Sequence, residues 1–371
     1  MFGIKIRLLV LLVAFKLESK ALGFSSLPTL SGDSPPTSDS RWKRVSDNSH
    51  ASATPLEMSS IAAGGAAEEA EASGKGGATI PNLTVSLVKG IVGAGVLSLP
   101  SGIAAFGDSP SALVPAMVLI AMIGGMSAYS YSLLGRTASI SSSSTFGETW
   151  DNSVGSSSAW IPAAVGTVDS FITNMAYSMI LADTFCALLK TIGYSTVTRN
   201  QTLLGVTGFA LLPLCLLKNL SSLAPFSFLG SAGMMYTSLV MAVRYFGKGY
   251  ALPGGKFLAD LGTKPMFGTR GAKGALSPNV FILVCMLSTA FNAHFNAPKF
   301  YNELKDSTVA RFNKVVFPSF GIAMSIFCFI AGMGFLTFGK ASNGFILNNY
   351  SNTDTLMGIS RLAVAMSILF S

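Results

Sequence analysis

One stretch of the sequence, Lys89–Pro100, gathers helix-disfavouring residues inside an apolar segment. It holds three glycines and a proline within twelve residues. In a helix interior Gly costs about 1 kcal/mol relative to Ala, and Pro about 3 kcal/mol. A helix that unwinds in mid-membrane would expose N–H groups and carbonyls to a ligand, and transporters aim such half-helix N-termini at a substrate carboxylate. Close packing of small residues against a neighbouring helix explains the same stretch equally well.

A second stretch, Phe291–Pro298, interrupts a later apolar segment with two Asn, one His and one Pro. Polar groups at this depth are costly in lipid unless they face a cavity. A lone buried His is more often a satisfied core residue than a ligand, but His294 has polar neighbours. Corresponding interruptions in the two halves of a transporter indicate its binding site. We therefore predict a substrate site that contains Gly93, Ala94, Gly95, Val96, Asn292, His294 and Asn296.

Two carboxylates lie in the third apolar segment, where ionisable groups are functional candidates. Asp169 and Asp183 are fourteen residues apart, about four helical turns or roughly 21 Å, so they share one helix face. Both are candidates for ion coupling. Asp183 lies near the expected end of its helix, where water could simply solvate it. Asp169 is therefore the preferred candidate for a proton relay.

The composition indicates which environment these residues occupy. Half of the 371 residues are hydrophobic, 11% are charged, and the mean hydropathy is +0.54. Soluble domains carry about 25% charged residues, so the natural solvent of this chain is a lipid bilayer. The net charge of +8 is scattered, and without a basic stripe a nucleic-acid partner is not expected. The four cysteines lie in apolar segments without metal-like spacing, so no metal site is expected: Cys186, Cys215, Cys285 and Cys328.

Long apolar runs predict an all-α polytopic membrane protein, because about 20 residues cross the hydrocarbon and backbone in lipid must be helical. We expect seven full spans and one partial span that stops at the end of the sequence. The expected spans are Ile80–Phe106, Ala112–Leu134, Trp160–Leu189, Leu203–Leu217, Leu223–Phe246, Val280–Phe300, Val315–Phe338 and Leu356–Ser371.

The N-terminal part has a different composition. Residues 1–23 contain Lys5 and Arg7, a short apolar run and a small-x-small cleavage pattern, which predict a targeting signal. An uncleaved, frayed N-terminus is the alternative. Residues 24–79 are rich in Ser, Pro, Gly and Ala, so we expect them to be disordered. The arrangement resembles the bipartite presequences of algae with complex plastids, although acidic residues depart from a transit peptide. Residues 80–371 form the predicted transmembrane domain.

Several motifs resemble the amino acid/auxin permease family, especially its proton-coupled and vacuolar members. They occur in the family's order and cover the predicted transmembrane domain. They are Gly-x-Gly-x-Leu-x-Leu-Pro at Gly93–Pro100, Phe146-Gly147-Glu148, Tyr177–Asp183, Leu212–Leu220, and His294 followed by Tyr301-Asn302-Glu303-Leu304-Lys305.

The resemblance implies the LeuT-like fold of two inverted five-helix repeats, with broken first and sixth helices. The family usually has eleven helices, so the sequence looks truncated in the eighth. Sodium-coupled members typically place Asn at the position of Lys89. The lysine here resembles the proton-coupled branch of the family, which implies that this chain is coupled to protons. A lysine that snorkels to the interface is the alternative.

The function expected from this resemblance is secondary active transport of amino acids, coupled to protons or less favourably to sodium, without a further cofactor. An amino acid sensor and a non-transporting fragment are the alternatives. An enzyme is not expected, because the sequence lacks His-Glu-x-x-His, Gly-x-Ser-x-Gly and a phosphate loop. The membrane would be vacuolar or another endomembrane, the plasma membrane, or a plastid envelope.

Overall fold

The computed structural model describes residues 76–369, apart from 192, 195 and 213–223. Within these ranges the chain is helical, and its β-type pairings are two isolated bridges, Ala78 with Leu304 and Met266 with Gly339. The predicted all-α class is therefore confirmed. The predicted targeting signal and nearly all of the predicted disordered region lie outside the described residues.

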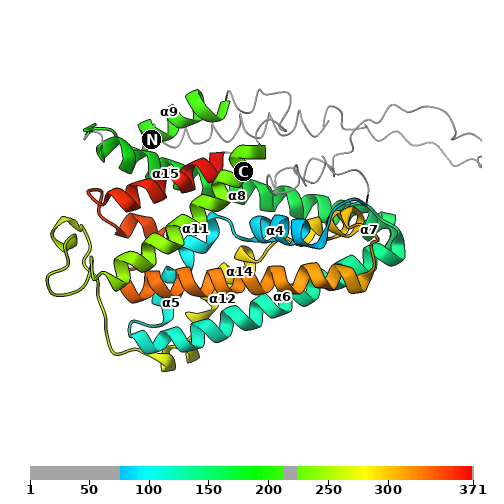
Figure 1. The fold of residues 1–371 in the computed structure, drawn as a ribbon, viewed down its shortest axis with the longest axis horizontal. Helices are drawn as coiled ribbons and strands as arrows, with labels where there is room; N and C mark the ends of the chain where they lie inside the picture. Colours follow the sequence, from blue (N-terminus) through cyan, green and yellow to red (C-terminus); the bar gives the residue numbers. More distant parts are fainter. Residues whose placement is uncertain (1–75, 192, 195, 213–223, 370–371) are drawn as a thin grey trace, which may run out of the picture.

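The long helices run beside one another along the length of the molecule, with α14 packed against α4, α5, α6 and α11 (Figure 1). A second group joins α8, α11 and α15. In chain order the α-helices are α4 (Ile80–Ile91), α5 (Leu99–Phe106), α6 (Leu113–Ser141), α7 (Phe146–Ser153), α8 (Trp160–Thr191), α9 (Arg199–Val206), α11 (Ala224–Phe246), α12 (Val280–Ala290), α13 (Ala297–Glu303), α14 (Val309–Phe338) and α15 (Thr355–Leu369). Short segments near the site are η1 (Ala94–Ser98), η4 (Thr207–Leu211), η8 (His294–Asn296) and η9 (Ile346–Asn349).

Four helical segments in the described ranges are long and apolar enough to cross a membrane: Pro110–Ser141, Ser156–Thr191, Val280–Glu303 and Val309–Phe338. A fifth arises if α4 and the segment Ala94–Phe106, bent by 44° at their break, count as one span. These five correspond to the first, second, third, sixth and seventh predicted spans. The fourth predicted span begins on α9 and η4 and runs into residues outside the described ranges, while α11 and α15 occupy the fifth and eighth.

The predicted ends of two spans were wrong. The second was expected to end at Leu134, but α6 continues to Ser141; the seventh was expected to begin at Val315, but α14 begins at Val309. At the start of α14 the reason is capping rather than hydropathy. The Thr308 hydroxyl accepts a hydrogen bond from the backbone N–H of Arg311 at 3.3 Å, and so satisfies a donor that the first turn leaves unpaired.

Both predicted breaks are present in the backbone. Helix α4 stops at Ile91 and η1 starts at Ala94, with Gly93 extended between them at φ −98° and ψ −178°. Likewise α12 stops at Ala290 and helical structure resumes at His294. Each restart has a proline in the first two positions of the next α-helix, Pro100 in α5 and Pro298 in α13. Proline is tolerated there because a first-turn N–H has no intrahelical acceptor anyway.

An aromatic cluster holds the second break against α14. Phe291, the residue after α12, is fully buried. Its ring centroid lies 4.6 Å from that of Phe327 and 6.2 Å from that of Phe320, both on α14. In a bilayer this contact is stabilised by van der Waals packing, because lipid tails are as apolar as the side chains themselves. The break is therefore fixed on one side by packing, which leaves its other side available to line a cavity.

A buried ionic cluster joins the end of α11 to the start of α15. The fully buried Asp354 carboxylate accepts hydrogen bonds from Arg244 Nε at 2.8 Å, Arg244 Nη2 at 2.6 Å and the Tyr250 hydroxyl at 2.9 Å. Burial raises the pKa of Tyr250, and the neighbouring Asp354 charge raises it further. On α15, Arg361 donates to the carbonyl oxygens of Leu347 at 2.9 Å and Tyr350 at 2.7 Å. These bonds order the segment between α14 and α15, part of which faces the cavity.

Candidate substrate site

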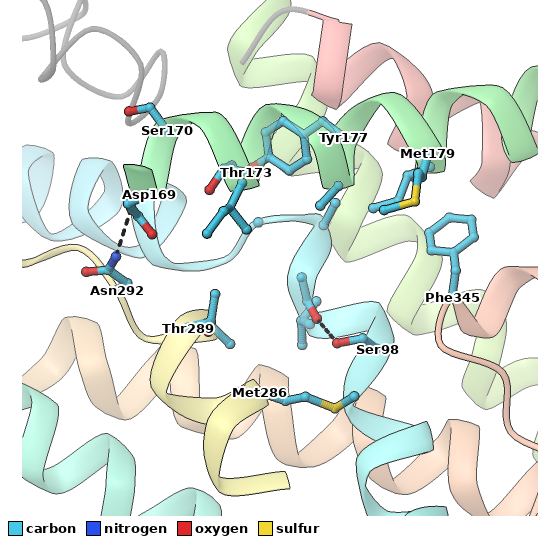
Figure 2. A pocket seen from close by; sticks show the side chains of 18 of the residues that line it. Ser98, Asp169, Ser170, Thr173, Tyr177, Met179, Met286, Thr289, Asn292 and Phe345 are labelled. Carbon is cyan, nitrogen blue, oxygen red and sulfur yellow. Dashed lines mark hydrogen bonds between the residues drawn. The ribbon is translucent and has the colours of Figure 1, made fainter. Parts of the chain in front are cut away.

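A cavity of about 730 Å³ lies between the two broken spans and α8. Figure 2 shows α8 along one side, the first break opposite it, and the end of α12 below. Helix α9 and the segment Asn343–Phe345 complete the wall. The polar or charged residues that line the cavity are Ser98, Asp169, Ser170, Thr173, Tyr177, Asp183, Arg199, Thr289, Asn292, Asn296 and Asn343.

The predicted residues of the first break all line this cavity: Gly93, Ala94, Gly95 and Val96. Ala94 and Gly95 begin η1, and the first N–H groups of a helix have no acceptor within it. A methyl group at Gly95 would meet no atom within 4 Å, and one at Gly93 would lie 3.8 Å from the Tyr177 hydroxyl. Neither glycine is therefore required for close packing. The structure favours an exposed backbone over the packing explanation of these glycines.

The second break contributes two predicted residues, Asn292 and Asn296, which have different surroundings. Asn292 Nδ2 donates to Asp169 Oδ2 at 3.2 Å, which links the break to α8 (Figure 2). Asn296 is only 7% exposed, and within the described ranges its Oδ1 atom has no hydrogen-bond partner. A buried acceptor left without a donor is costly. Since Asn296 lines the cavity, a donor on a bound ligand could satisfy it.

His294, also predicted to bind substrate, is not among the residues that line the cavity. Its Nε2 atom lies 3.2 Å from the carbonyl oxygen of Ser127 on α6, and its ring meets the Tyr131 ring edge-on at 5.9 Å between centroids. The side chain thus packs on the α6 side of the break. These contacts are those of a satisfied core histidine rather than of a ligand, which is the role that its polar neighbours in the sequence had favoured.

Both predicted carboxylates of α8 line the cavity, in agreement with the shared helix face. Asp183 does not lie at a helix end, because α8 continues to Thr191. It forms an ion pair with Arg199 at the start of α9 and accepts a 3.4 Å bond from Asn348. Arg199 also donates to the carbonyl oxygen of Met179 at 3.3 Å. Asp183 is therefore a junction between α8, α9 and the segment before α15.

Lys89, the remaining predicted ion-coupling residue, is half-buried in the last turn of α4. It does not line the cavity itself but directly precedes Gly90, which does. Its position beside the unwound segment agrees with the placement expected from the family pattern.

Several lining residues were not predicted from the sequence. Arg199 lies before the fourth predicted span, where a single arginine carries no signal for a cavity. Thr173 and Tyr177 face the first break from α8 (Figure 2), and only Tyr177 belonged to a family motif. Phe345 reaches the cavity from the loop after α14. No periodicity in the sequence could have indicated a loop residue that folds back onto the bundle.

Two of the family motifs pack around the second break. The Phe146 ring of α7 meets the Phe295 ring at 5.5 Å between centroids. The Tyr301 hydroxyl donates to Ser139 Oγ at 2.8 Å, and Asn302 Nδ2 donates to the Ser143 carbonyl oxygen at 2.7 Å. The motif at Leu212–Leu220 lies, except for its first residue, outside the described ranges.

A bundle of long apolar helices in which two interrupted spans face one cavity is the arrangement typical of membrane transporters. The chain belongs to the transmembrane amino acid transporter protein family, whose model matches residues 76–371. This is an integral membrane protein of a transporter family, as predicted, rather than an enzyme.

The similarity of the chain to individual proteins is distant. The chain is 23% identical over 302 residues to the putative sodium-coupled neutral amino acid transporter 11 of Danio rerio, covering 80% of this chain and 63% of that protein. It is 22% identical over 297 residues to vacuolar amino acid transporter 2 of Saccharomyces cerevisiae, covering 77% and 57%. It is 25% identical over 283 residues to amino acid transporter AVT6E of Arabidopsis thaliana, covering 74% and 55%. The chain thus spans between 55% and 63% of the length of these relatives.

Proposed function

We propose that this protein carries amino acids across a membrane by secondary active transport. The observation that carries the proposal is the cavity between the two breaks, which offers donors on one wall and, on the other, a buried acceptor that has no partner among the described residues. The family, and the relatives named as amino acid transporters, support the same conclusion.

The cavity matches the two charged groups that every amino acid shares. The N–H groups of Ala94 and Gly95, at the positive end of a helix, suit the carboxylate. The Asn296 oxygen, which has no partner within the described ranges, suits the ammonium, together with the last carbonyl groups of α12; of these, the Leu287 and Thr289 oxygens already accept from the N–H groups of Phe291 and Asn292. Each charged group of a bound amino acid would otherwise be desolvated without a partner. We therefore assign substrate binding to Gly93–Val96 and Asn296, and give Asn292 the role of positioning Asp169.

We further propose that transport is coupled to protons, with Asp169 as the group that takes the proton. Asp183 is less suited, because a proton there would have to displace the Arg199 guanidinium. Lys89 supports the choice of proton over sodium, because the sodium-coupled members that the motifs resemble typically carry Asn at this position. A vacuolar or other endomembrane location fits the relative that is named a vacuolar transporter; the plasma membrane and a plastid envelope are the other locations we propose to test.

Counterflow in proteoliposomes tests the function directly. Vesicles that contain the purified protein are loaded with unlabelled amino acids and diluted into a trace of the same amino acids in radiolabelled form. A carrier accumulates label transiently without any ion gradient, whereas a sensor or a non-transporting fragment binds amino acid but accumulates none. The absence of accumulation, in vesicles whose protein still binds label, would refute transport.

A further inference from the structure

The positive and negative charges of the residues that line the cavity are unequal in number. Within the described ranges they are Asp169, Asp183 and Arg199. Arg199 is engaged by Asp183, so that pair is neutral. The hydrogen bond recorded for the Asp169 carboxylate comes from the neutral Asn292 amide. The cavity therefore holds one carboxylate whose charge no lining cation offsets.

This carboxylate lies within reach of an amino acid bound at the first break. Gly93 adjoins the Tyr177 hydroxyl, which places the break beside the middle of α8. Asp169 precedes Tyr177 by eight residues, about 12 Å along the helix axis. Thr173 lies between them on the cavity wall (Figure 2). A substrate whose carboxylate is bound at the break would therefore reach Asp169 only with an extended side chain, such as those of the basic amino acids.

We propose that the preferred substrates are amino acids with a cationic side chain, and that Asp169 pairs with that side-chain cation. The inference rests on the proposed function, because it assumes that the cavity binds an amino acid. An unoffset carboxylate in a partly buried site is costly, and a cationic ligand that neutralises it recovers part of that cost.

The α-ammonium of the substrate has other acceptors available. The Asn296 oxygen is buried and unsatisfied within the described ranges, and it lies at the restart of the second break. The terminal carbonyl groups of α12 lie across the same break. Asp169 is consequently left for a second cation, which only basic amino acids carry. While Asp169 holds a side-chain cation it cannot also hold the coupling proton, so the two occupants exclude each other.

The test is equilibrium binding of radiolabelled lysine and radiolabelled leucine to the purified chain in detergent, measured by scintillation proximity. The variants are Asp169→Asn, Asp169→Glu and, as a matched control outside the cavity, Asp151→Asn on the exposed surface of α7. Asp169→Asn should weaken lysine binding at least about tenfold, the lower range for a charge-assisted bond. Its leucine affinity should stay within about twofold. Asp169→Glu should retain most of the lysine affinity, and Asp151→Asn should leave both affinities unchanged.

Two results would overturn the inference. If lysine and leucine lose affinity equally in Asp169→Asn, the carboxylate takes the α-ammonium common to all substrates. If the wild-type chain binds leucine but not lysine, the cavity does not select basic side chains. The proposed transport function survives both results, since the wild-type chain binds leucine in each of them. Conversely, selective lysine binding without counterflow would refute transport and leave this inference standing.

Discussion

Gly95→Val tests the assignment of the unwound segment as the carboxylate site. Gly95 is exposed to the cavity, and its backbone angles do not require glycine. A Cβ atom built there meets no atom of the described residues within 4 Å. The valine side chain would therefore enter the space proposed for the substrate carboxylate without distorting the protein around it.

The expected loss of affinity follows from the donors that the valine would cover. Ala94 and Gly95 provide two N–H groups at the start of η1. A hydrogen bond to a charged group contributes about 1.5–3 kcal/mol. Loss of both costs about 3 kcal/mol or more, which is at least roughly a hundredfold in the dissociation constant. The melting temperature should change little, because the substitution adds an apolar side chain in open space.

The measurement is amino acid binding by scintillation proximity, together with thermal unfolding in detergent. Gly125→Val is the matched control, since Gly125 is exposed on α6, has no atom within 4 Å of its methyl position and does not line the cavity. It should alter neither binding nor stability. Gly124→Val is the packing control, because its side chain would lie 2.5 Å from Met324 Sδ. That variant should unfold at a lower temperature.

One result would refute the assignment. If Gly95→Val binds amino acid with wild-type affinity while the protein remains folded, the carboxylate does not occupy the first break. The glycines of that segment would then need an explanation other than ligand approach or close packing.

Three further predictions concern coupling and stability. Uptake of a neutral amino acid such as leucine, which leaves Asp169 free to take the proton, should persist in sodium-free buffer and rise with an inward proton gradient; strict sodium dependence would contradict proton coupling. Asp354→Ala should lower the free energy of unfolding by roughly 3–5 kcal/mol, as measured by thermal or chemical unfolding, because Arg244 keeps a largely buried charge without its carboxylate. Hydrogen bonds from the Ser144 backbone and side chain lower the pKa of Glu148 below its ordinary value of 4.5. The Glu148 carboxylate therefore stabilises the folded chain fully at pH values above its ordinary pKa. This stabilisation is lost as the pH falls through the lowered pKa of the folded state. The melting temperatures of wild type and Glu148→Gln should converge in that acidic range, and a constant difference would contradict the assignment.

Much of the architecture could be predicted because it depends on local properties of the chain. Apolar length alone indicates a spanning helix, since backbone groups in lipid must be hydrogen-bonded within their own segment. The breaks at Gly93 and at Asn292–Ala293 were likewise predictable, because glycine, proline and clustered polar residues disfavour a helix wherever it packs. Helix ends were predicted less well. Thr308 shows why: a single capping hydroxyl can extend a helix beyond its apolar run.

What the sequence determined by itself was therefore that the helices span a membrane and where two of them unwind. The tertiary structure decided which polar side chains share the cavity. Successive residues of a helix point about 100° apart, so the rotation that packing imposes on each helix decides which side chains face inward. That rotation and packing turn His294 toward α6, leave Asn296 at the cavity wall, and bring Arg199 to Asp183 across sixteen residues. No local pattern encodes these pairings, because each depends on contacts between helices that are distant in the chain.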